Sequence, residues 1–185
     1  MSSSILQGKR ILITQADAFM GPVLCEVFAE QGALVIASTQ SLIDAQAPAG
    51  VVAAAGPIDV LVVNLALPAP STLAAEVSEA EWHDTFAALV HPLQRLVSAA
   101  LPQMIARGAG KILVMGSASA LRGMKRASTY SAARGAQLAY VQSVGVEVAA
   151  HNIQVNVIAQ NFVENPTYFP PRGPGQPAIP RAIEA

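Results

Sequence analysis

Three side chains in the second half of the chain have the types and the spacing to act together chemically. Ser117 is followed after thirteen residues by Tyr130, and after four more by Arg134. A separation of four residues places Tyr130 and Arg134 on one face of a helix. A phenol can take up a proton as a base when a nearby permanent cation stabilises its ionised form, and a hydroxyl can hold the oxygen that gives up that proton. We therefore interpret Ser117, Tyr130 and Arg134 as a candidate catalytic trio.

The elements around this trio predict where it lies in the fold. Ser117 follows the apolar run 111–115, which is typical of a buried strand, and ligands of open α/β sheets bind beyond the carboxyl ends of the strands. Further strands are expected at 9–14, 33–37, 58–63 and 155–158, and helices at 22–31, within 40–56, at 78–107 and at 127–150. This alternation predicts the α/β class, with a Rossmann-like, doubly wound parallel sheet in a single domain spanning 1–185. The tail 164–185 is rich in Pro and Gly and is expected to be mostly loop.

Composition narrows the classes of protein that fit. The chain is 52% hydrophobic and 12% charged, with a mean hydropathy of +0.43, which favours burial of surface in an oligomer. No apolar run approaches the roughly 20 residues of a membrane span. A net charge of −1 without a basic cluster argues against nucleic acid as a partner. A single cysteine, Cys25, and a start without a signal-peptide pattern indicate a cytoplasmic protein.

Other polar and aromatic residues receive structural interpretations. The histidines at 83, 91 and 151 have no metal-binding partner at useful spacing, so no metal site is expected. Asn64, at the end of a predicted strand, is expected to be a hydrogen-bonding residue of the fold. Tyr140 is expected to be packed rather than reactive. Ser78 is expected to cap the long helix that follows it.

The chain resembles the short-chain dehydrogenase/reductase family over nearly all its length. The resemblance rests on Thr14 after the first strand, on Asn64, and on the serine and tyrosine with a basic residue four positions later. Members that bind a dinucleotide carry Thr-Gly-x-x-x-Gly-x-Gly after the first strand, because only glycine lets the backbone approach a pyrophosphate. Here two of the three glycines are replaced, one of them by Phe19, and the second predicted strand ends without an acid for the ribose. We therefore expect no dinucleotide cofactor.

The departures from that family pattern are similar to those of the halohydrin dehalogenases, which share the fold and have replaced the cofactor site by a halide pocket. The matching pattern is Thr14-x4-Phe19-x-Gly21 together with Ser117-x12-Tyr130-x3-Arg134. Arginine stands where the reductases use lysine. By the resemblance, the halide-binding residues are Phe19, Gln160, Asn161, Phe162, Val163, Tyr168 and Phe169.

The resemblance implies a lyase that closes vicinal halohydrins to epoxides without redox chemistry, releasing halide and a proton. The same site would open epoxides with small anions such as azide, cyanide and nitrite. Tyr130 would be the base, Ser117 would hold the substrate oxygen, and Arg134 would stabilise the phenolate. Leu65 stands where some members carry an acidic residue near the arginine. A homotetramer is implied, because the long helices of this family commonly pack between subunits.

Two other interpretations stay open. The first is an NAD(P)-dependent reductase with a degenerate cofactor loop, and the second is a non-catalytic subunit that kept the interface of the fold. The chain ends at Ala185, before the further helices and last strand usual in the family, so a C-terminally shortened sheet is expected. Substrate size, regioselectivity, enantiopreference and halide preference have no signature in the sequence.

Overall fold

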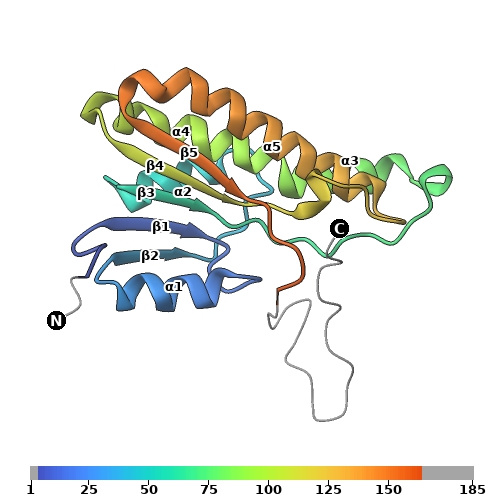
Figure 1. The fold of residues 1–185 in the computed structure, drawn as a ribbon, viewed down its shortest axis with the longest axis horizontal. Coiled ribbons are helices and arrows are strands. Elements are labelled where there is room, and N and C mark those ends of the chain that lie inside the picture. Colours follow the sequence, from blue (N-terminus) through green and yellow to red (C-terminus); the bar gives the residue numbers. More distant parts are fainter. Residues whose placement is uncertain (1–3, 164–185) are drawn as a thin grey trace, which may run out of the picture.

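A parallel five-stranded sheet forms the centre of the computed structural model, which describes residues 4–163 (Figure 1). The strands are β1 (Arg10–Thr14), β2 (Leu34–Ser38), β3 (Val60–Val63), β4 (Gly110–Met115) and β5 (Ile153–Ile158). The helices are α1 (Gly21–Glu30), α2 (Ala47–Ala55), α3 (Glu79–Leu89), α4 (His91–Arg107) and α5 (Ser128–Val148), with short 3-10 helices η1 (Ala74–Glu76), η2 (Ala118–Ala120) and η3 (Ala149–His151). The predicted α/β class and Rossmann-like parallel sheet are confirmed.

The order of the strands creates a crevice for ligands. The sheet runs β2-β1-β3-β4-β5, so the chain reverses its direction of travel across the sheet after β2. Helix α1 covers one face of the sheet, while α4 and α5 lie on the other (Figure 1). In such sheets the ligand site lies beyond the carboxyl ends of the strands, near the point where the order reverses. Of the two neighbouring strands near this point, β1 ends at Thr14, and Asn64 directly follows β3.

The core on the α4 and α5 side is the larger of two apolar clusters. Leucines of the predicted long helix contribute to it, since Leu89, Leu93 and Leu96 are at most 1% exposed. These three leucines are therefore core residues. Trp82 is partly exposed and stacks on Phe86 at 4.8 Å between ring centroids.

The expected single helix over 78–107 is wrong, because the structure has two helices that meet at Val90. The cause is Pro92, which has no N–H to donate back and whose ring would clash with the carbonyl of residue 88. The start of the segment agrees with the prediction: Ser78 Oγ accepts a hydrogen bond from the Glu81 N–H at 3.1 Å. The other elements match the predicted ranges apart from shifts at their ends. The tail 164–185 lies outside the described residues.

Gly21 allows α1 to begin against the loop that follows β1. A Cβ atom at this position would lie 2.5 Å from the Gln15 carbonyl oxygen and 2.6 Å from the Ala16 carbonyl carbon. We expect Gly21→Ala to lower the free energy of unfolding by about 1–3 kcal/mol, because backbone atoms must shift. The matched control is Gly50→Ala in α2, where a Cβ meets nothing within 4 Å and is expected to be neutral or slightly stabilising. Urea unfolding followed by circular dichroism measures both, and equal midpoints for the two variants would contradict this account.

Candidate functional site

A pocket of about 640 Å³ opens at the carboxyl ends of the strands. Its walls come from the loops after β1, β3, β4 and β5 and from the first turn of α5. The lining residues are Phe19, Leu67, Pro68, Ala69, Gly116, Ser117, Ser119, Arg122, Gly123, Met124, Lys125, Tyr130, Gln160, Asn161 and Phe162. The position expected from the sheet topology therefore coincides with a cavity of the size usual for small-molecule ligands.

Ser117 stands in this pocket as the first residue after the Gly116 that follows β4. Its hydroxyl oxygen accepts hydrogen bonds from the Ser119 N–H at 3.2 Å and the Ser119 hydroxyl at 3.0 Å. The backbone on both sides is tied to the end of β5, because Gly116 N donates to Ile158 O and Ala118 N donates to Gln160 O. The serine is thus held in place by the strand and the following turn, while its own O–H proton remains available as a donor.

Tyr130 lines the pocket, and Arg134 lies behind it, one turn further along α5. The guanidinium carbon of Arg134 is 5.0 Å from the centroid of the Tyr130 ring, a cation–π distance. The predicted shared helix face is therefore present. The cation contacts the ring of Tyr130 and does not line the pocket itself.

The guanidinium of Arg134 is buried and bonded to neutral oxygens. The residue is 2% exposed. One terminal nitrogen donates to the Met115 carbonyl and to Gln137 Oε1, and the other donates to the Leu65 carbonyl, each at 3.0 Å. No carboxylate pairs with Arg134 within residues 4–163. Within the described residues, its positive charge is therefore not neutralised by a carboxylate.

Sequence reasoning missed the residues that hold Arg134. Gln137, which is fully buried, accepts from Arg134 and donates to the Leu89 carbonyl at 2.6 Å, so it links the arginine to the end of α3. Its position three residues after Arg134 on the same helix was the available signal. The side chain of Leu65 cannot accept a hydrogen bond. The guanidinium of Arg134 donates instead to the backbone carbonyl of Leu65.

The expected halide-binding residues are only partly brought together within the described range. Phe19, Gln160, Asn161 and Phe162 line the pocket with Ser117 and Tyr130. Val163 is described but is not among the lining residues. Tyr168 and Phe169 lie outside the described residues.

The loop after β1 is built differently from a glycine-rich turn. Gln15 and Phe19 both adopt left-handed backbone conformations, with φ of 44° and 55°, although neither is glycine. Asn64 holds this loop through its side-chain amide, which donates to the Gln15 and Ala18 carbonyls at 2.9 Å each. The Gln15 side chain in turn accepts from the Ala66 N–H at 2.6 Å. Asn64 is thus a structural hydrogen-bonding residue, as predicted.

The residues of this loop do not fit a dinucleotide pyrophosphate. That group is bound by free N–H donors at the start of α1. Here the Gly21 N–H donates to the Ala18 carbonyl, and Pro22 has no N–H. The Phe19 side chain, which is 9% exposed, packs with Ile11, Ile13 and Met115. The start of α1 therefore offers an apolar wall and few donors.

A carboxylate ties the loop above the pocket to the helix that carries Tyr130. Glu81 accepts from the Thr72 hydroxyl at 2.7 Å with one oxygen and from the Thr129 hydroxyl at 2.9 Å with the other. Thr129 is 1% exposed and precedes Tyr130 in the first turn of α5. The Thr72 N–H also donates to the Arg126 carbonyl. The loops at 67–73 and 118–126 are therefore fixed to each other and to α5.

Sequence reasoning also missed a short basic segment at the rim of the pocket. Arg122, Lys125 and Arg126 fall within five positions of the loop between η2 and α5. Arg122 and Lys125 line the pocket and are exposed. Their closeness in the sequence was the available signal, and it was overlooked because the net charge is close to zero.

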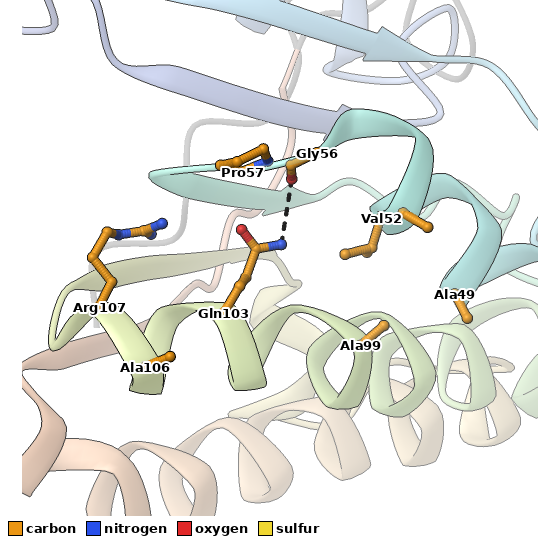
Figure 2. A pocket seen from close by; sticks show the side chains of 9 residues that line it. Ala49, Val52, Gly56, Pro57, Ala99, Gln103, Ala106 and Arg107 are labelled. Atoms are coloured by element: carbon orange, nitrogen blue, oxygen red, sulfur yellow. Dashed lines mark hydrogen bonds between the residues drawn. The ribbon is translucent and has the colours of Figure 1, made fainter.

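A second pocket, of about 730 Å³, lies at the opposite ends of the strands, between α2 and α4 (Figure 2). Its apolar lining consists of four alanines together with Val52 and Pro57. The polar groups at its edge already have partners. Gln103 accepts from the Ile58 N–H and donates to the Gly56 carbonyl, the bond drawn in Figure 2, while Arg107 donates to the Ile58 carbonyl. This pocket offers no group for chemistry.

The described residues show neither a metal-binding cluster nor a membrane-spanning helix. Residues 4–163 contain no group of three or more His, Cys, Asp or Glu side chains placed to hold a metal ion. His83 is exposed and contacts Glu79 on the same helix at 3.5 Å. Among the helices of this same range, none is both long and apolar enough to cross a bilayer.

The comparisons with known proteins define the family. The sequence model described as short chain dehydrogenase matches residues 44–169, more than half of the chain. The protein therefore belongs to the short-chain dehydrogenase family.

Individual relatives within this family differ in their activities. The 3-oxoacyl-[acyl-carrier-protein] reductase FabG of Escherichia coli (strain K12) is 28% identical over 183 residues, covering 85% of this chain and 75% of the relative. The 2-keto-3-deoxy-L-fuconate dehydrogenase of Xanthomonas campestris pv. campestris is 31% identical, covering 88% of this chain and 61% of the relative. A solved structure named "Dehalogenation enzyme" is 32% identical with a TM-score of 0.83, covering 90% of this chain and 78% of that one.

Proposed function

We propose that this short-chain dehydrogenase family member is a cofactor-independent halohydrin dehalogenase, a lyase that converts vicinal halohydrins to epoxides. The observation that carries the proposal is the pocket itself. Ser117 and Tyr130 face the same cavity as Phe19, which occupies the loop where a dinucleotide pyrophosphate would otherwise bind. A site with a candidate base, and with an apolar side chain and few N–H donors where a pyrophosphate would bind, favours proton transfer without hydride transfer.

The proposed reaction needs only the groups in this pocket. Tyr130, with the Arg134 guanidinium beside its ring, acts as the base that takes the proton of the substrate hydroxyl, while the Ser117 hydroxyl donates to the substrate oxygen. The resulting alkoxide forms a bond to the neighbouring carbon from the side opposite the halogen. The carbon–halogen bond breaks, and its electron pair leaves with the halide. The proton passes from Tyr130 to solvent, so an epoxide, a halide ion and a proton are the products.

The halide is assigned to the side of the pocket formed by Phe19 and residues 160–162. An anion that leaves during the reaction needs hydrogen-bond donors within apolar walls. Phe19 and Phe162 supply apolar surface, and the buried Nε2 of Gln160 has no hydrogen-bond partner within the described residues. Val163, Tyr168 and Phe169 are retained in the proposal from the sequence resemblance. In reverse, the same place would hold azide, cyanide or nitrite during epoxide opening.

The relatives support two activities of this family. The solved structure named "Dehalogenation enzyme" favours the lyase. The reductase and dehydrogenase names of the curated relatives favour an NAD(P)-dependent oxidoreductase as the second candidate. The start of α1, with Phe19 and Pro22, is the observation that supports the lyase over the reductase.

We also propose that copies of this chain associate with one another. The apolar composition and exposed apolar side chains such as Val146, which is 82% exposed on α5, favour a homo-oligomer. A homotetramer is the form that we propose. A cytoplasmic location, from the sequence, is part of the same proposal.

Nicotinamide binding tests the two candidates directly. We expect no saturable change in the fluorescence of NADPH or NADH on titration with the protein, because the first turn of α1 lacks the donors for a pyrophosphate. The same sample is expected to release halide from 1,3-dichloro-2-propanol with no nicotinamide present. Tight, saturable NADPH binding would overturn the lyase proposal and favour the reductase. A folded sample that neither binds NADPH nor releases halide would point to a non-catalytic subunit.

A further inference from the structure

The rim of the pocket carries two cations that the proposed reaction does not use. Arg122 and Lys125 line the pocket from the loop between η2 and α5. No hydrogen bond or ion pair connects either side chain to another of the residues in 4–163. Arg126 is different, because its guanidinium donates to the Ser71 hydroxyl at 3.3 Å and the Ser71 carbonyl at 3.1 Å. Two of the three cations of this segment are therefore free to meet a ligand.

The backbone keeps these two cations at the rim. At one end of the segment the Arg122 N–H donates to the Ala118 carbonyl at 3.2 Å, beside Ser117. At the other end the Arg126 carbonyl accepts from the Thr72 N–H at 2.8 Å. The segment is thus tied both to the turn that carries the serine and to the loop across the pocket.

The charge of the pocket is one-sided. Among residues 4–163, none of those that line the pocket is Asp or Glu. Asp17, on the loop after β1, is exposed and is not among them. A cleft with charge of one sign attracts ligands of the opposite sign and raises their association rate.

The reacting side chains and the two cations differ in how deeply they lie in the pocket, and this difference orients a bound substrate. Ser117 and Tyr130 are partly buried, whereas Arg122 and Lys125 are exposed, so the cations lie on the solvent side of the reacting groups. A substrate whose hydroxyl meets Tyr130 has its far end toward the rim. Apolar surface from Leu67 and Met124 lies in the same pocket.

We propose that the substrate is a small halohydrin or epoxide that carries an anionic group, such as a carboxylate, at the end remote from the reacting carbons, and that Arg122 and Lys125 bind this group. This proposal rests on the proposed dehalogenase function and names the substrate class of that site. The reaction is unchanged: the ring oxygen comes from the hydroxyl, the halide leaves, and the carboxylate takes no part in bond making.

The test compares two substrates that differ in charge and hardly in size, 4-chloro-3-hydroxybutanoate and 4-chloro-3-hydroxybutanamide. An exposed ion pair changes an affinity by a factor of about two to five, so two pairs are expected to give the carboxylate an advantage of about tenfold in kcat/KM. The double variant Arg122→Gln/Lys125→Gln is expected to lose this advantage. The matched control is Lys9→Gln. It removes an exposed charge just before β1, at the amino ends of the strands, and is expected to leave the ratio of the two kcat/KM values unchanged.

The outcomes separate this proposal from the function on which it rests. Release of chloride from both substrates with equal kcat/KM would overturn the anionic substrate class and leave the dehalogenase intact. A carboxylate preference that survives in the double variant would overturn the assignment to Arg122 and Lys125. If the cations serve only to collect small anions, the double variant would raise the KM for azide in epoxide opening and leave the ratio of the two halohydrins unchanged, which also overturns the proposal.

A binding measurement covers the case in which no chloride is released. Calorimetric titration with the halogen-free 3-hydroxybutanoate and 3-hydroxybutanamide does not depend on turnover. We expect the carboxylate to bind about tenfold more tightly to the unaltered chain and the difference to vanish in the double variant. Equal binding of the two compounds would overturn the proposal whatever the protein catalyses.

Discussion

Replacing Tyr130 by Phe is expected to abolish halide release while leaving the fold intact. The variant keeps the ring that contacts Arg134 and removes only the oxygen that accepts the proton. General base catalysis contributes about 10²–10⁴-fold to a rate, so the loss of turnover is expected in that range or beyond it. The measurement is chloride released from 1,3-dichloro-2-propanol with no nicotinamide present, with circular dichroism to compare the folds.

Tyr140 provides the matched control on the same helix. It packs partly buried against the large core and does not line the pocket. Burial, with a smaller contribution from the nearby Glu147 carboxylate, raises the pKa of Tyr140, and a hydrogen bond with Ser98 opposes this. Tyr140 therefore stays neutral at ordinary pH, and Tyr140→Phe is expected to release chloride at the rate of the unaltered chain. Equal rates for Tyr130→Phe and the unaltered chain would exclude Tyr130 as the base.

Arg134→Met is expected to remove activity and to lower stability together. The substitution leaves the Met115 and Leu65 carbonyls and the Gln137 side chain without their buried donor. Each unsatisfied buried group costs about 1–3 kcal/mol, and relief from burying the charge offsets a part, so we expect a net loss of about 2–4 kcal/mol in the free energy of unfolding. Urea unfolding measures this loss, and the chloride assay measures the activity.

Arg134→Lys separates the two effects of the arginine. It keeps a positive charge near the Tyr130 ring, but a single ammonium cannot reproduce the planar fork of the guanidinium, which reaches two carbonyls. We expect stability between that of the unaltered chain and Arg134→Met, with part of the chloride release retained. Arg95→Met on α4, which makes none of these bonds, is the control for loss of an arginine. If Arg134→Met released chloride as fast as Arg134→Lys, the charge would have no role in the reaction.

The fold could be predicted because its signals are local. Three apolar runs of the sequence end next to Thr14, Asn64 and Ser117. Because the strands are parallel, their carboxyl ends all lie at the same end of the sheet. The cap at Ser78 was visible for the same reason, since its partner is three residues away. The break at Val90 was also signalled in the sequence, because proline is favoured in the first turn of a helix and Pro92 therefore marks the start of a second helix.

The arrangement around Arg134 could not be predicted, since its partners are mainly backbone carbonyls. The Met115 and Leu65 carbonyls would be present with any side chain at those positions, so no residue type signals them. The same holds for the loop after β1. Its sequence shows that glycines are replaced, but only the structure shows that the N–H of Gly21 is already used by Ala18.

In the proposed enzyme, the carboxylate of Glu81 is expected to couple substrate selectivity to reaction rate. One oxygen holds Thr72 on the loop over the pocket, and the other holds Thr129, next to Tyr130. A substitution in that loop that changes the space for a substrate is also expected to move Thr72. Through Glu81 this would shift Thr129 and the first turn of α5, which carries the proposed base Tyr130. Directed evolution of substrate range at positions 67–73 would therefore change turnover number along with preference, and libraries that vary Glu81 and Thr129 together with the loop would recover combinations that single-position libraries miss.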